Sequence, residues 1–360
     1  MAKRYGVAVI GAGDRGRVYS NVWKNVDGIE LVSICDIIEE RAENVYHQFS
    51  YKARYSDYKS AIDRDDVDIV TICTPAYFHS EIGIFAMERG KHVLCEKPMD
   101  LSLEKAEKMI KTSEETERVL AFGFQYHNIA GFRKIKKAID KDIIGRPVII
   151  KFADIRQIRP KLAMHDAMYG NGGPIVDMCS HYFDLMRWYF NSEPVRVMAS
   201  GFIFSKGRNE LSTIQYKALD TASIIIEFSS GDIGMITVTW GLPPKVDGKP
   251  EAGMIGPLGL LETDNPFGNN EVICKLEGGV TKEIQLSQED LEECVWPEKT
   301  LVKRFLSAID GKGVPQRGRK DGYIALASSL ATIKSIIQKR PVTLEEIYRE
   351  KPSVMDCMKG

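Results

Sequence analysis

Residues Val7 to Gly16 read VAVIGAGDRG, and this stretch predicts how the first part of the chain folds. Its apolar, β-branched beginning has the composition of a buried strand, while Val18, Val22 and Trp23 follow at helical spacing. A G-x-G-x-x-G sequence between a strand and a helix turns the backbone tightly and directs amide groups and the positive helix end at a pyrophosphate. The stretch therefore predicts a dinucleotide-binding turn, with an ordinary tight turn as the alternative.

The acidic residue after the next predicted strand strengthens this interpretation. The strand covers Ile29 to Cys35 and leads into Asp36, 20 residues beyond Gly16. A carboxylate at this place accepts hydrogen bonds from the adenosine ribose diol and repels the 2′-phosphate of NADP, and the two isoleucines that follow supply no cation. We therefore expect NAD as the cofactor, with a preference over NADP. The alternative role of Asp36 is the N-cap of a helix predicted over Glu39–Phe49.

Strands and helices then alternate through the first third of the chain. Further strands are predicted at Val67–Cys73 and Val119–Phe124, and another strand is predicted to end at Lys97. Helices are predicted at Phe78–Glu88 and Ser102–Glu115. This alternation predicts a parallel sheet with helices on both faces, and ligands bind such a sheet where its strands end. The residues that one site at this edge would collect are Gly13, Asp36, Thr74, Pro75, Glu96 and Lys97.

A lysine stands at the end of one of these strands, in the sequence GKHVLCEKP from Gly90 to Pro98. Val93 to Cys95 form a short apolar run, and a carboxylate, an amine and a proline follow it. An amine is costly to place in a partly buried cleft, and the proline fixes the backbone behind it. Lys97 is therefore a candidate for chemistry, with a solvated strand end as the alternative.

A second motif, GGPIVDMCSHYFD, covers Gly172 to Asp184. If Pro174 opens a helix, Asp177, His181 and the final aspartate share one helix face. A carboxylate one turn before an imidazole orients the ring and holds its tautomer. A helix-surface pair is the alternative for Asp177 and His181, and Asp184 is a candidate for a structural role. Zinc prefers nitrogen and sulfur ligands, and neither a cysteine nor a second histidine stands at ligand spacing, so no metal site is expected.

The pattern changes after the first third, where strands dominate. Two hairpins with glycine-containing turns are predicted, Thr221–Phe228 with Ile233–Trp240 and Glu271–Leu276 with Thr281–Leu286. We expect an α/β protein with a Rossmann dinucleotide-binding domain over residues 1–122 and a substrate-binding and oligomerisation domain over residues 123–360. The second domain is expected to be α+β, with a largely antiparallel open sheet. The glycine- and proline-rich segment from residue 241 to residue 270 is expected to be a loop.

Two further segments of the second domain have helical patterns. The first is basic and is expected to present a solvated face; its cations are Arg133, Lys134, Lys136 and Lys137. The second carries an apolar stripe that is expected to lie in the core, formed by Leu326, Leu330, Ile333 and Ile337.

Composition excludes several classes of protein. The 360 residues suffice for about two domains of ~150 residues, and 44% hydrophobic and 28% charged residues argue against disorder. A net charge of -1 gives no broad attraction to nucleic acid. Met1, Lys3 and Arg4 lead directly into a strand with no signal-peptide pattern, and no apolar run approaches the roughly 18 residues of a membrane span. The seven cysteines have no C-x-x-C spacing, which fits a cytoplasmic protein.

The motifs together resemble the Gfo/Idh/MocA family of dehydrogenases, named for glucose-fructose oxidoreductase, inositol dehydrogenase and rhizopine catabolism. The resemblance rests on GAGDRG, on CTPAYFHSEIGIFAMERGKHVLCEKP from Cys73 to Pro98, and on the pattern G-G-x-x-x-D-x-x-x-H-x-x-D, and it covers nearly the whole chain. IGPLG, from Ile255 to Gly259, resembles a degraded form of the family's glycine-containing hairpin. In that family the lysine of E-K-P contacts the reacting hydroxyl, and the first aspartate and the histidine of the second motif face substrate.

The resemblance and the patterns give three sets of candidate residues. The catalytic set is Lys97, His181 and Asp177. The cofactor-binding set is Gly11, Gly13, Asp14, Arg15, Gly16, Asp36, Thr74, Pro75, His79, Glu96, Lys97 and Gln125. The substrate set is Tyr126, His127, Arg156, Arg159, Lys161, His165 and Trp240.

Some residues of the cofactor and substrate sets need a further comment. Asp14 places a negative charge near the expected pyrophosphate, and we expect Arg15 to offset it. His79 has a structural role as its alternative. Arg156, with the basic residues that follow it, hints at an acidic substrate group, with a solvated basic loop as the alternative.

Three functions remain open from the sequence. The first is an NAD-dependent dehydrogenase for a secondary hydroxyl of a sugar, polyol or derivative. The second is a redox-neutral lyase, glycosidase or epimerase that keeps NAD bound, and the third is a non-catalytic NAD-binding regulator, against which the intact Lys97, Asp177 and His181 argue. We expect a homodimer or homotetramer with a small-molecule carbohydrate or polyol as substrate, and neither nucleic acid nor membrane as partner.

Overall fold

Six apolar runs of the first part of the chain form one parallel sheet in the computed structural model, which describes residues 5–263, 265–268 and 271–359. The strands are β1 (Tyr5–Ile10), β2 (Ile29–Cys35), β3 (Ala53–Tyr55), β4 (Ile69–Ile72), β5 (His92–Cys95) and β6 (Leu120–Phe122). Their order is β3-β2-β1-β4-β5-β6, and β1 and β4 are buried along their whole length. The order reverses between β1 and β4, which is where such sheets bind ligands. The predicted α/β fold of this part is confirmed.

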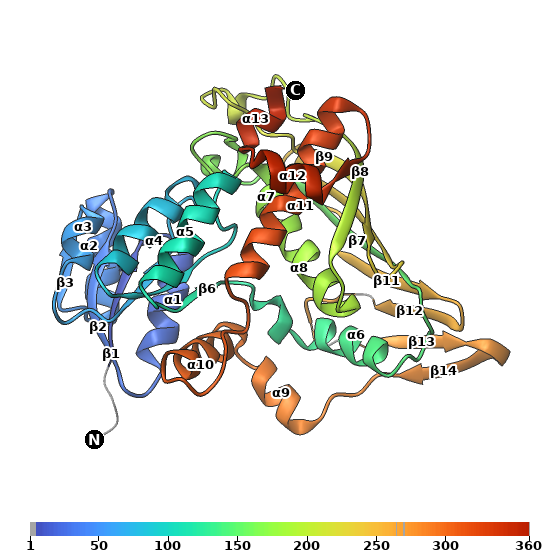
Figure 1. The fold of residues 1–360 in the computed structure, drawn as a ribbon, viewed down its shortest axis with the longest axis horizontal. Coiled ribbons are helices and arrows are strands. Elements are labelled where there is room, and N and C mark those ends of the chain that lie inside the picture. The colour runs from blue at the N-terminus through green and yellow to red at the C-terminus, as the bar shows by residue number, and fades with distance from the viewer. Residues whose placement is uncertain (1–4, 264, 269–270, 360) are drawn as a thin grey trace. The chain divides into compact units, whose positions relative to one another are not determined.

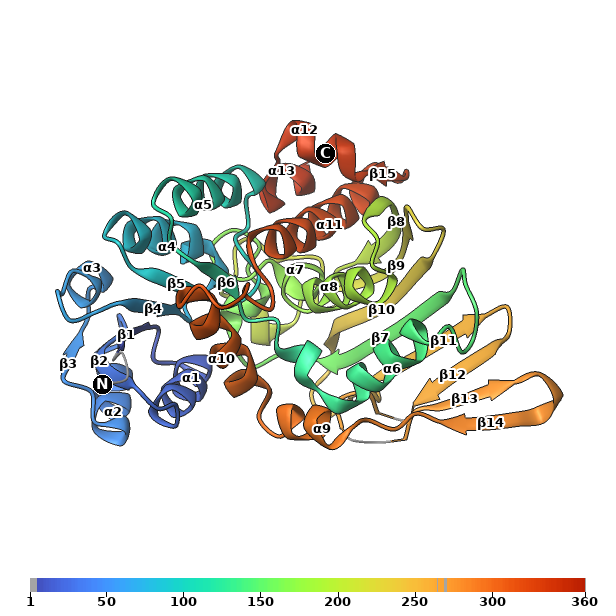
Figure 2. The ribbon, with the colours of Figure 1, turned by 60° about the horizontal axis from the view of Figure 1, so that its bottom comes forward.

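Helices cover both faces of this sheet, with α1 and α2 on one side and α4 and α5 on the other (Figure 2). Their bounds are α1 (Asp14–Lys24), α2 (Glu39–Phe49), α3 (Tyr58–Ile62), the 3-10 turn η1 (Ala76–Phe78), α4 (His79–Glu88) and α5 (Leu103–Glu115). β2 and α2 have the predicted bounds. β3 and α3 were not predicted, because a three-residue strand and a five-residue helix are too short to show a period.

The chain folds into two units, and the first unit takes back a late segment. It contains the residues up to Asp100, Glu104–Phe124 and Glu298–Tyr323. In Figure 1 the orange-brown helix α10 (Pro297–Ile309) lies beside the blue α1. Tyr5 Oη donates to Asp310 Oδ1 at 2.6 Å, and Phe122 N donates to Arg317 O at 3.0 Å. The assignment of residues 298–323 to the second domain is therefore wrong, because such long-range hydrogen bonds leave no local pattern in the sequence.

The second unit is built on a nine-stranded sheet. Its strands are β7 (Ile149–Gln157), β8 (Pro194–Phe202), β9 (Thr221–Phe228), β10 (Ile233–Leu242), β11 (Glu251–Gly256), β12 (Gly259–Thr263), β13 (Ile273–Leu276), β14 (Val280–Glu283) and β15 (Val342–Thr343). Their order is β14-β13-β12-β11-β7-β10-β9-β8-β15. The described pairs are antiparallel except β7 with β10, which is parallel. The predicted, largely antiparallel sheet is confirmed.

Both predicted hairpins are present, β9 with β10 and β13 with β14. Their turns contain Gly231 at φ +87°, and Gly278 and Gly279 at φ +72° and +79°, a conformation that favours glycine. The loop expected from residue 241 to residue 270 is wrong in part, because β11 and β12 lie inside it; residues 264, 269 and 270 are outside the described residues. On β11 the buried residues Ala252 and Met254 alternate with less buried neighbours, so this strand contributes to the core.

The helices of the second unit cover one face of its sheet. Their bounds are the 3-10 turns η2 (Gln125–Asn128), η3 (Leu162–His165), η4 (Asn209–Leu211) and η5 (Glu277–Gly279), and the helices α6 (Ala130–Asp140), α7 (Gly173–Asp177), α8 (Cys179–Phe190), α9 (Gln288–Cys294), α11 (Arg319–Gln338), α12 (Leu344–Glu350) and α13 (Val354–Lys359). α11 begins in the first unit and belongs to the second from Ile324 onward. Three residues of its predicted stripe are buried, and Ile337 is half-buried.

The expected solvated face of the basic helix α6 is wrong. Lys134 is buried, and Arg133 donates to Asp290 Oδ1 at 3.2 Å and pairs with Glu293. These carboxylates belong to α9, far along the chain, so Arg133 meets partners that the sequence of α6 does not show, whereas Lys136 pairs with Asp140 of α6 itself.

Within the described residues, no helix is both long and apolar enough to cross a membrane. All seven cysteines are free thiols, and five of them are buried. Met1 to Arg4, on which the absence of a signal-peptide pattern rests, lie outside the described residues.

Candidate active site

The three glycines of the turn after β1 serve different purposes. Gly11 has φ +98°, and a Cβ on it would lie 2.7 Å from the Cys73 carbonyl. A Cβ on Gly16 would lie 1.9 Å from Gly11 O, so α1 packs against the turn only without a side chain there. Around Gly13 a Cβ meets no atom within 4 Å, which leaves the backbone open on that side. This is the arrangement that brings a pyrophosphate close to the N-terminus of α1, so the turn fits a dinucleotide.

Asp36 is fixed beside this turn. Its Oδ2 accepts a hydrogen bond from Ala12 N at 2.8 Å, and its Oδ1 accepts one from Ile38 N at 2.9 Å. The N-cap of α2 is Ile38, so the alternative role of Asp36 as that cap is wrong. Ile37 is 88% exposed, and among the described residues no cation pairs with Asp36. The carboxylate therefore stands where it can receive a ribose diol and repel a 2′-phosphate.

His79 connects two loops at the carboxyl ends of β4 and β5. Its Nε2 lies 2.8 Å from Thr74 O and its Nδ1 lies 2.8 Å from Pro98 O. The ring is 1% exposed, and burial lowers the pKa of His79, which the two carbonyl oxygens raise only in part. His79, expected in the cofactor set, is therefore a buried support that sets the distance between the Thr74-Pro75 loop and the loop of Lys97.

Arg15 joins the glycine turn to the E-K-P loop. Its Nε donates to Glu96 Oε1 at 2.8 Å, its Nη2 lies 2.7 Å from the same oxygen in the ion pair, and its Nη1 donates to Glu298 Oε1 at 3.2 Å. Burial alone would lower the pKa of Arg15, but the nearby Glu96 carboxylate raises it above its usual value. The guanidinium also lies 5.2 Å from the ring centroid of Tyr19, whose pKa burial raises. Arg15, expected to offset Asp14, is thus held by two carboxylates, and Lys97 follows one of them directly, half-buried at the cofactor edge.

In the second unit the Gly172–Asp184 motif forms two helices rather than one. Pro174 stands in the first turn of α7, as predicted, but Met178 separates α7 from α8. Asp177 and His181 are both 3% exposed, so the surface-pair alternative is wrong. Asp177 Oδ2 accepts from Asn171 Nδ2 at 2.9 Å, and the backbone of Met178 stays in the right-handed helical region, at φ -86° and ψ -45°.

Tyr126 is the ring partner of His181. The two ring centroids are 3.8 Å apart with planes at 11°, so the imidazole is stacked and its orientation is fixed. Asp184 instead pairs with His127 in the interior, where the histidine ring also lies 4.3 Å from Trp188. The predicted structural role of Asp184 fits this pair, and His127, a substrate candidate, belongs to the core.

Asp154, a buried carboxylate outside the three candidate sets, connects two substrate candidates. Asp154 Oδ2 accepts from Arg156 Nε at 3.0 Å and Nη2 at 2.6 Å, and Asp154 Oδ1 accepts from Trp240 Nε1 at 3.0 Å. Asp154 is 1% exposed and Trp240 2%. Burial lowers the pKa of Arg156, but the Asp154 carboxylate raises it more, so the net pKa is above its usual value. The missed signal is the aspartate at an inward position of β7, two residues after the buried Phe152.

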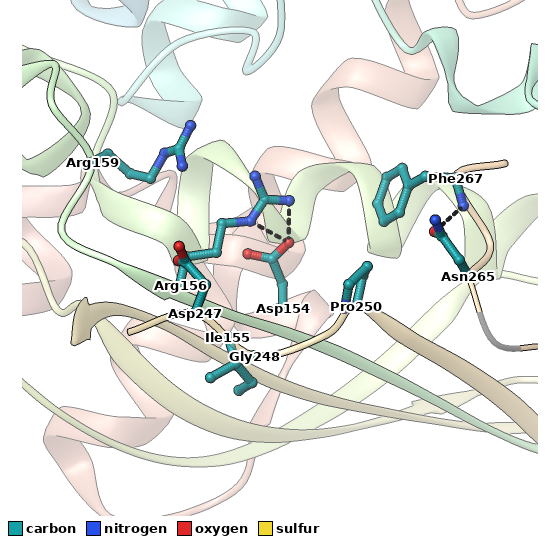
Figure 3. A pocket seen from close by; sticks show the side chains of 9 residues that line it. All are labelled: Asp154, Ile155, Arg156, Arg159, Asp247, Gly248, Pro250, Asn265 and Phe267. Atoms are coloured by element: carbon teal, nitrogen blue, oxygen red, sulfur yellow. Dashed lines mark hydrogen bonds and ion pairs between the residues drawn. The ribbon is translucent and has the colours of Figure 1, made fainter. Parts of the chain in front are cut away.

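The same strand borders an open pocket of about 380 Å³, shown in Figure 3. Its lining is Asp154, Ile155, Arg156, Arg159, Asp247, Gly248, Pro250, Asn265 and Phe267. Of the substrate candidates, His165 lies behind the pocket: it is buried, and its Nε2 accepts from Arg159 N at 3.1 Å. Lys161 is exposed and Gln125 is half-buried. In the part of the chain that the structure describes, no cluster of three or more histidine, cysteine or carboxylate side chains is arranged for a metal ion.

Comparison with known proteins matches both units. The family model described as "Oxidoreductase family, NAD-binding Rossmann fold" matches residues 5–124, and the model of the GFO/IDH/MocA C-terminal domain matches residues 132–258. The chain is 30% identical to scyllo-inositol 2-dehydrogenase (NAD(+)) of Bacillus subtilis over 94% of this chain and 96% of that one. It is 27% identical to myo-inositol 2-dehydrogenase of Thermotoga maritima over 95% and 99%.

Solved structures have the same fold. A probable dehydrogenase from Thermotoga maritima aligns with a TM-score of 0.75 at 26% identity, over 95% of this chain and 99% of that one. Levoglucosan dehydrogenase in complex with NADH and levoglucosan aligns with a TM-score of 0.83 at 20% identity, over 95% and 100%. The resemblance that the motifs indicated is confirmed by the two family models.

Proposed function

Because the chain belongs to the GFO/IDH/MocA family of NAD-binding oxidoreductases, we propose that it is a dehydrogenase acting on a secondary hydroxyl of a polyol, sugar or sugar derivative. NAD is the cofactor, as expected. Two of its relatives are named as inositol 2-dehydrogenases, which supports a polyhydroxylated ring as the kind of substrate.

The observation that carries the proposal is the Arg15–Glu96 ion pair in the first unit. It ties the helix of the nucleotide turn to the loop that bears Lys97, and Glu96 N also donates to Ile72 O of β4 at 2.9 Å. The lysine amine is therefore carried by the same sheet edge as the glycine turn. A cofactor held by that turn would have an amine at its reactive end.

We assign the proton chemistry to three side chains. Bound NAD would supply the hydride acceptor for the carbinol carbon, and the hydroxyl proton would then need a base in the protein. Lys97 hydrogen-bonds the reacting hydroxyl and polarises its oxygen. His181, whose ring is held by Tyr126, accepts the proton. Asp177, fixed by Asn171, grips a neighbouring hydroxyl.

The test is a screen of polyols and sugars that follows NADH absorbance. We expect accumulation of free NADH with at least one of them, and a loss of about 10²- to 10⁴-fold in kcat for Lys97→Met and for His181→Ala. NAD affinity measured by calorimetry is the control for both variants. Wild-type turnover in either variant would remove that residue from the mechanism, and turnover without NADH accumulation would favour redox-neutral chemistry.

We also propose a homo-oligomer that buries the helix-free face of the nine-stranded sheet. Met198, Ile225 and Met235 stand opposite one another on β8, β9 and β10, and are 57%, 41% and 39% exposed. Apolar side chains in one row form a patch of the kind that marks an interface. Light scattering should give a dimer or tetramer, and Ile225→Lys should lower the mass. A monomeric wild type would contradict the proposal.

We place the enzyme in the cytoplasm. The support is the thiol state of its cysteines, since all seven are free and burial raises the pKa of Cys35 to about 12. Such thiols persist in a reducing compartment.

A further inference from the structure

One arginine of the pocket in the second unit has no ion-pair partner among the residues that the structure describes. Arg156 is paired with Asp154, and Asp247 accepts from Gln157 N at 2.7 Å and from Gln157 Nε2 at 2.8 Å. Arg159 lines the same pocket, yet no described carboxylate lies within 4.0 Å of its guanidinium. Its Nε is buried and lacks a hydrogen-bond acceptor within the described residues. A buried donor without an acceptor is costly unless a ligand supplies one.

Arg159 is also held in place from behind. The buried His165 accepts from Arg159 N at 3.1 Å and its Nε2 lies 3.2 Å from Arg159 O. The ring of His165 therefore fixes the backbone at this position, on the loop that follows β7. Figure 3 shows the guanidinium groups of Arg159 and Arg156 on the same side of β7. The backbone of this residue therefore has less freedom to lose when the side chain binds an anion.

The pocket adjoins the proposed catalytic histidine within the second unit. Phe267 lines the pocket and packs edge-on against Tyr126, with ring centroids 5.1 Å apart. Tyr126 in turn stacks on His181. Tyr126 is therefore the single side chain that links the ring of His181 to a residue of the pocket lining, so the pocket is a candidate subsite for the same substrate.

We propose that Arg159 binds a carboxylate of the substrate, so that the enzyme acts on a sugar acid or polyol acid rather than on a neutral polyol. This proposal rests on the dehydrogenase function proposed above. A planar carboxylate accepts two parallel hydrogen bonds from one guanidinium, and its single charge matches the single cation left without a described partner. A phosphate, with about -1.5 to -2 charge, would need a second such cation, and Arg156 is occupied by Asp154.

The test compares acids with their neutral counterparts on the full-length protein with NAD. The probes are D-glucuronate against D-glucose, D-galacturonate against D-galactose, D-gluconate against D-glucitol, and D-glucose 6-phosphate. We expect a higher kcat/KM for at least one acid than for its neutral partner. In Arg159→Met the ratio of the two kcat/KM values should fall about 10- to 100-fold, and Arg159→Lys should restore part of it. Lys206→Met, which removes an exposed cation outside the pocket, is the matched control and should keep the ratio.

The outcomes separate this proposal from the dehydrogenase function. NADH formation with neutral compounds at rates equal to or above those with every acid overturns the carboxylate site and leaves the dehydrogenase standing. A preference for the phosphate also overturns it. If no probe is oxidised, calorimetry with the three acids decides: binding that Arg159→Met abolishes supports the anion site while the dehydrogenase function fails, and no Arg159-dependent binding overturns the site.

Discussion

In the first unit the candidate cofactor residues are positioned by backbone hydrogen bonds between neighbouring strand ends, whereas in the second unit the candidate substrate residues are positioned by other side chains. Gly11 N donates to Cys35 O at 2.7 Å and Glu96 N to Ile72 O at 2.9 Å, so the edge of the parallel sheet itself places the turn and the E-K-P loop. Asp154, by contrast, ties together Arg156 and Trp240 from two strands.

The difference teaches where each site tolerates change. A site set by backbone geometry fails when a Cβ is added at the wrong glycine. A site set by a buried carboxylate fails when that one group is removed, because its donors are left without an acceptor.

The largest expected effect on stability is in the second unit. Asp154→Ala removes the acceptor of both Arg156 and Trp240, and we expect the free energy of unfolding to fall by about 2 to 3 kcal/mol, discounted because Arg156 is partly exposed. Urea denaturation followed by tryptophan fluorescence measures this. Glu210→Ala, which removes an exposed acid of the second unit outside the pocket, is the control, with a change below about 0.5 kcal/mol. Equal midpoints for the two variants would show that the side-chain network does not hold the second unit together.

A pair of glycine variants separates folding from cofactor binding in the first unit. Gly16→Ala places a Cβ 1.9 Å from Gly11 O and should destabilise the protein by about 1 to 3 kcal/mol. Gly13→Ala meets no protein atom, so its unfolding midpoint should stay unchanged while NAD affinity falls roughly tenfold, because the methyl group occupies the side open to the pyrophosphate. Thermal unfolding and calorimetry with NAD measure the two effects. If Gly13→Ala binds NAD as the wild type does, the pyrophosphate does not lie at this turn.

One side chain of the first unit, Asp36, is expected to decide the preference for NAD over NADP. Wild type should prefer NAD to NADP, and Asp36→Asn should lower the ratio of the two kcat/KM values about tenfold, since the repulsion of a 2′-phosphate is lost. Glu40→Gln, an exposed acid at the start of α2, is the control. Equal or better turnover of the wild type with NADP would contradict the role given to Asp36.

The smallest effect is a pH dependence of stability. Burial lowers the pKa of His165, and of His79 in the first unit, below the ordinary value near 6.5, so the unfolded chain takes up protons on acidification that the folded units do not. The stability that each buried histidine contributes is complete above about pH 6.5 and is lost as the pH falls below that value. For one histidine the free energy of unfolding then falls by at most about 1.4 kcal/mol for each pH unit. Urea midpoints between about pH 5 and pH 7 should rise with pH, and less steeply in His165→Asn. An unchanged slope in this variant would mean that His165 is not a buried neutral base.

The same comparison explains what the sequence predicts. The glycine turn, Asp36 and the E-K-P loop follow from local patterns, because β1, β2 and β5 each deliver one motif to the same edge. Glu298 reaches Arg15 from 283 residues away, and Asp154 meets Trp240 from 86 residues away, so neither contact has a local signal. The hairpins were found from their glycine turns, while β11 and β12 were hidden by a composition typical of loops.

The central claim is that a secondary alcohol gives up a hydride in this protein, and isotope transfer tests it most directly. The best substrate of the screen, deuterated at the carbinol carbon, should react more slowly than its unlabelled form and deliver its deuterium to NADH that accumulates in solution. Lys97→Met should abolish that transfer. Deuterium that returns to the sugar product without free NADH, or product formed with no isotope effect and no labelled NADH, would contradict the dehydrogenase assignment.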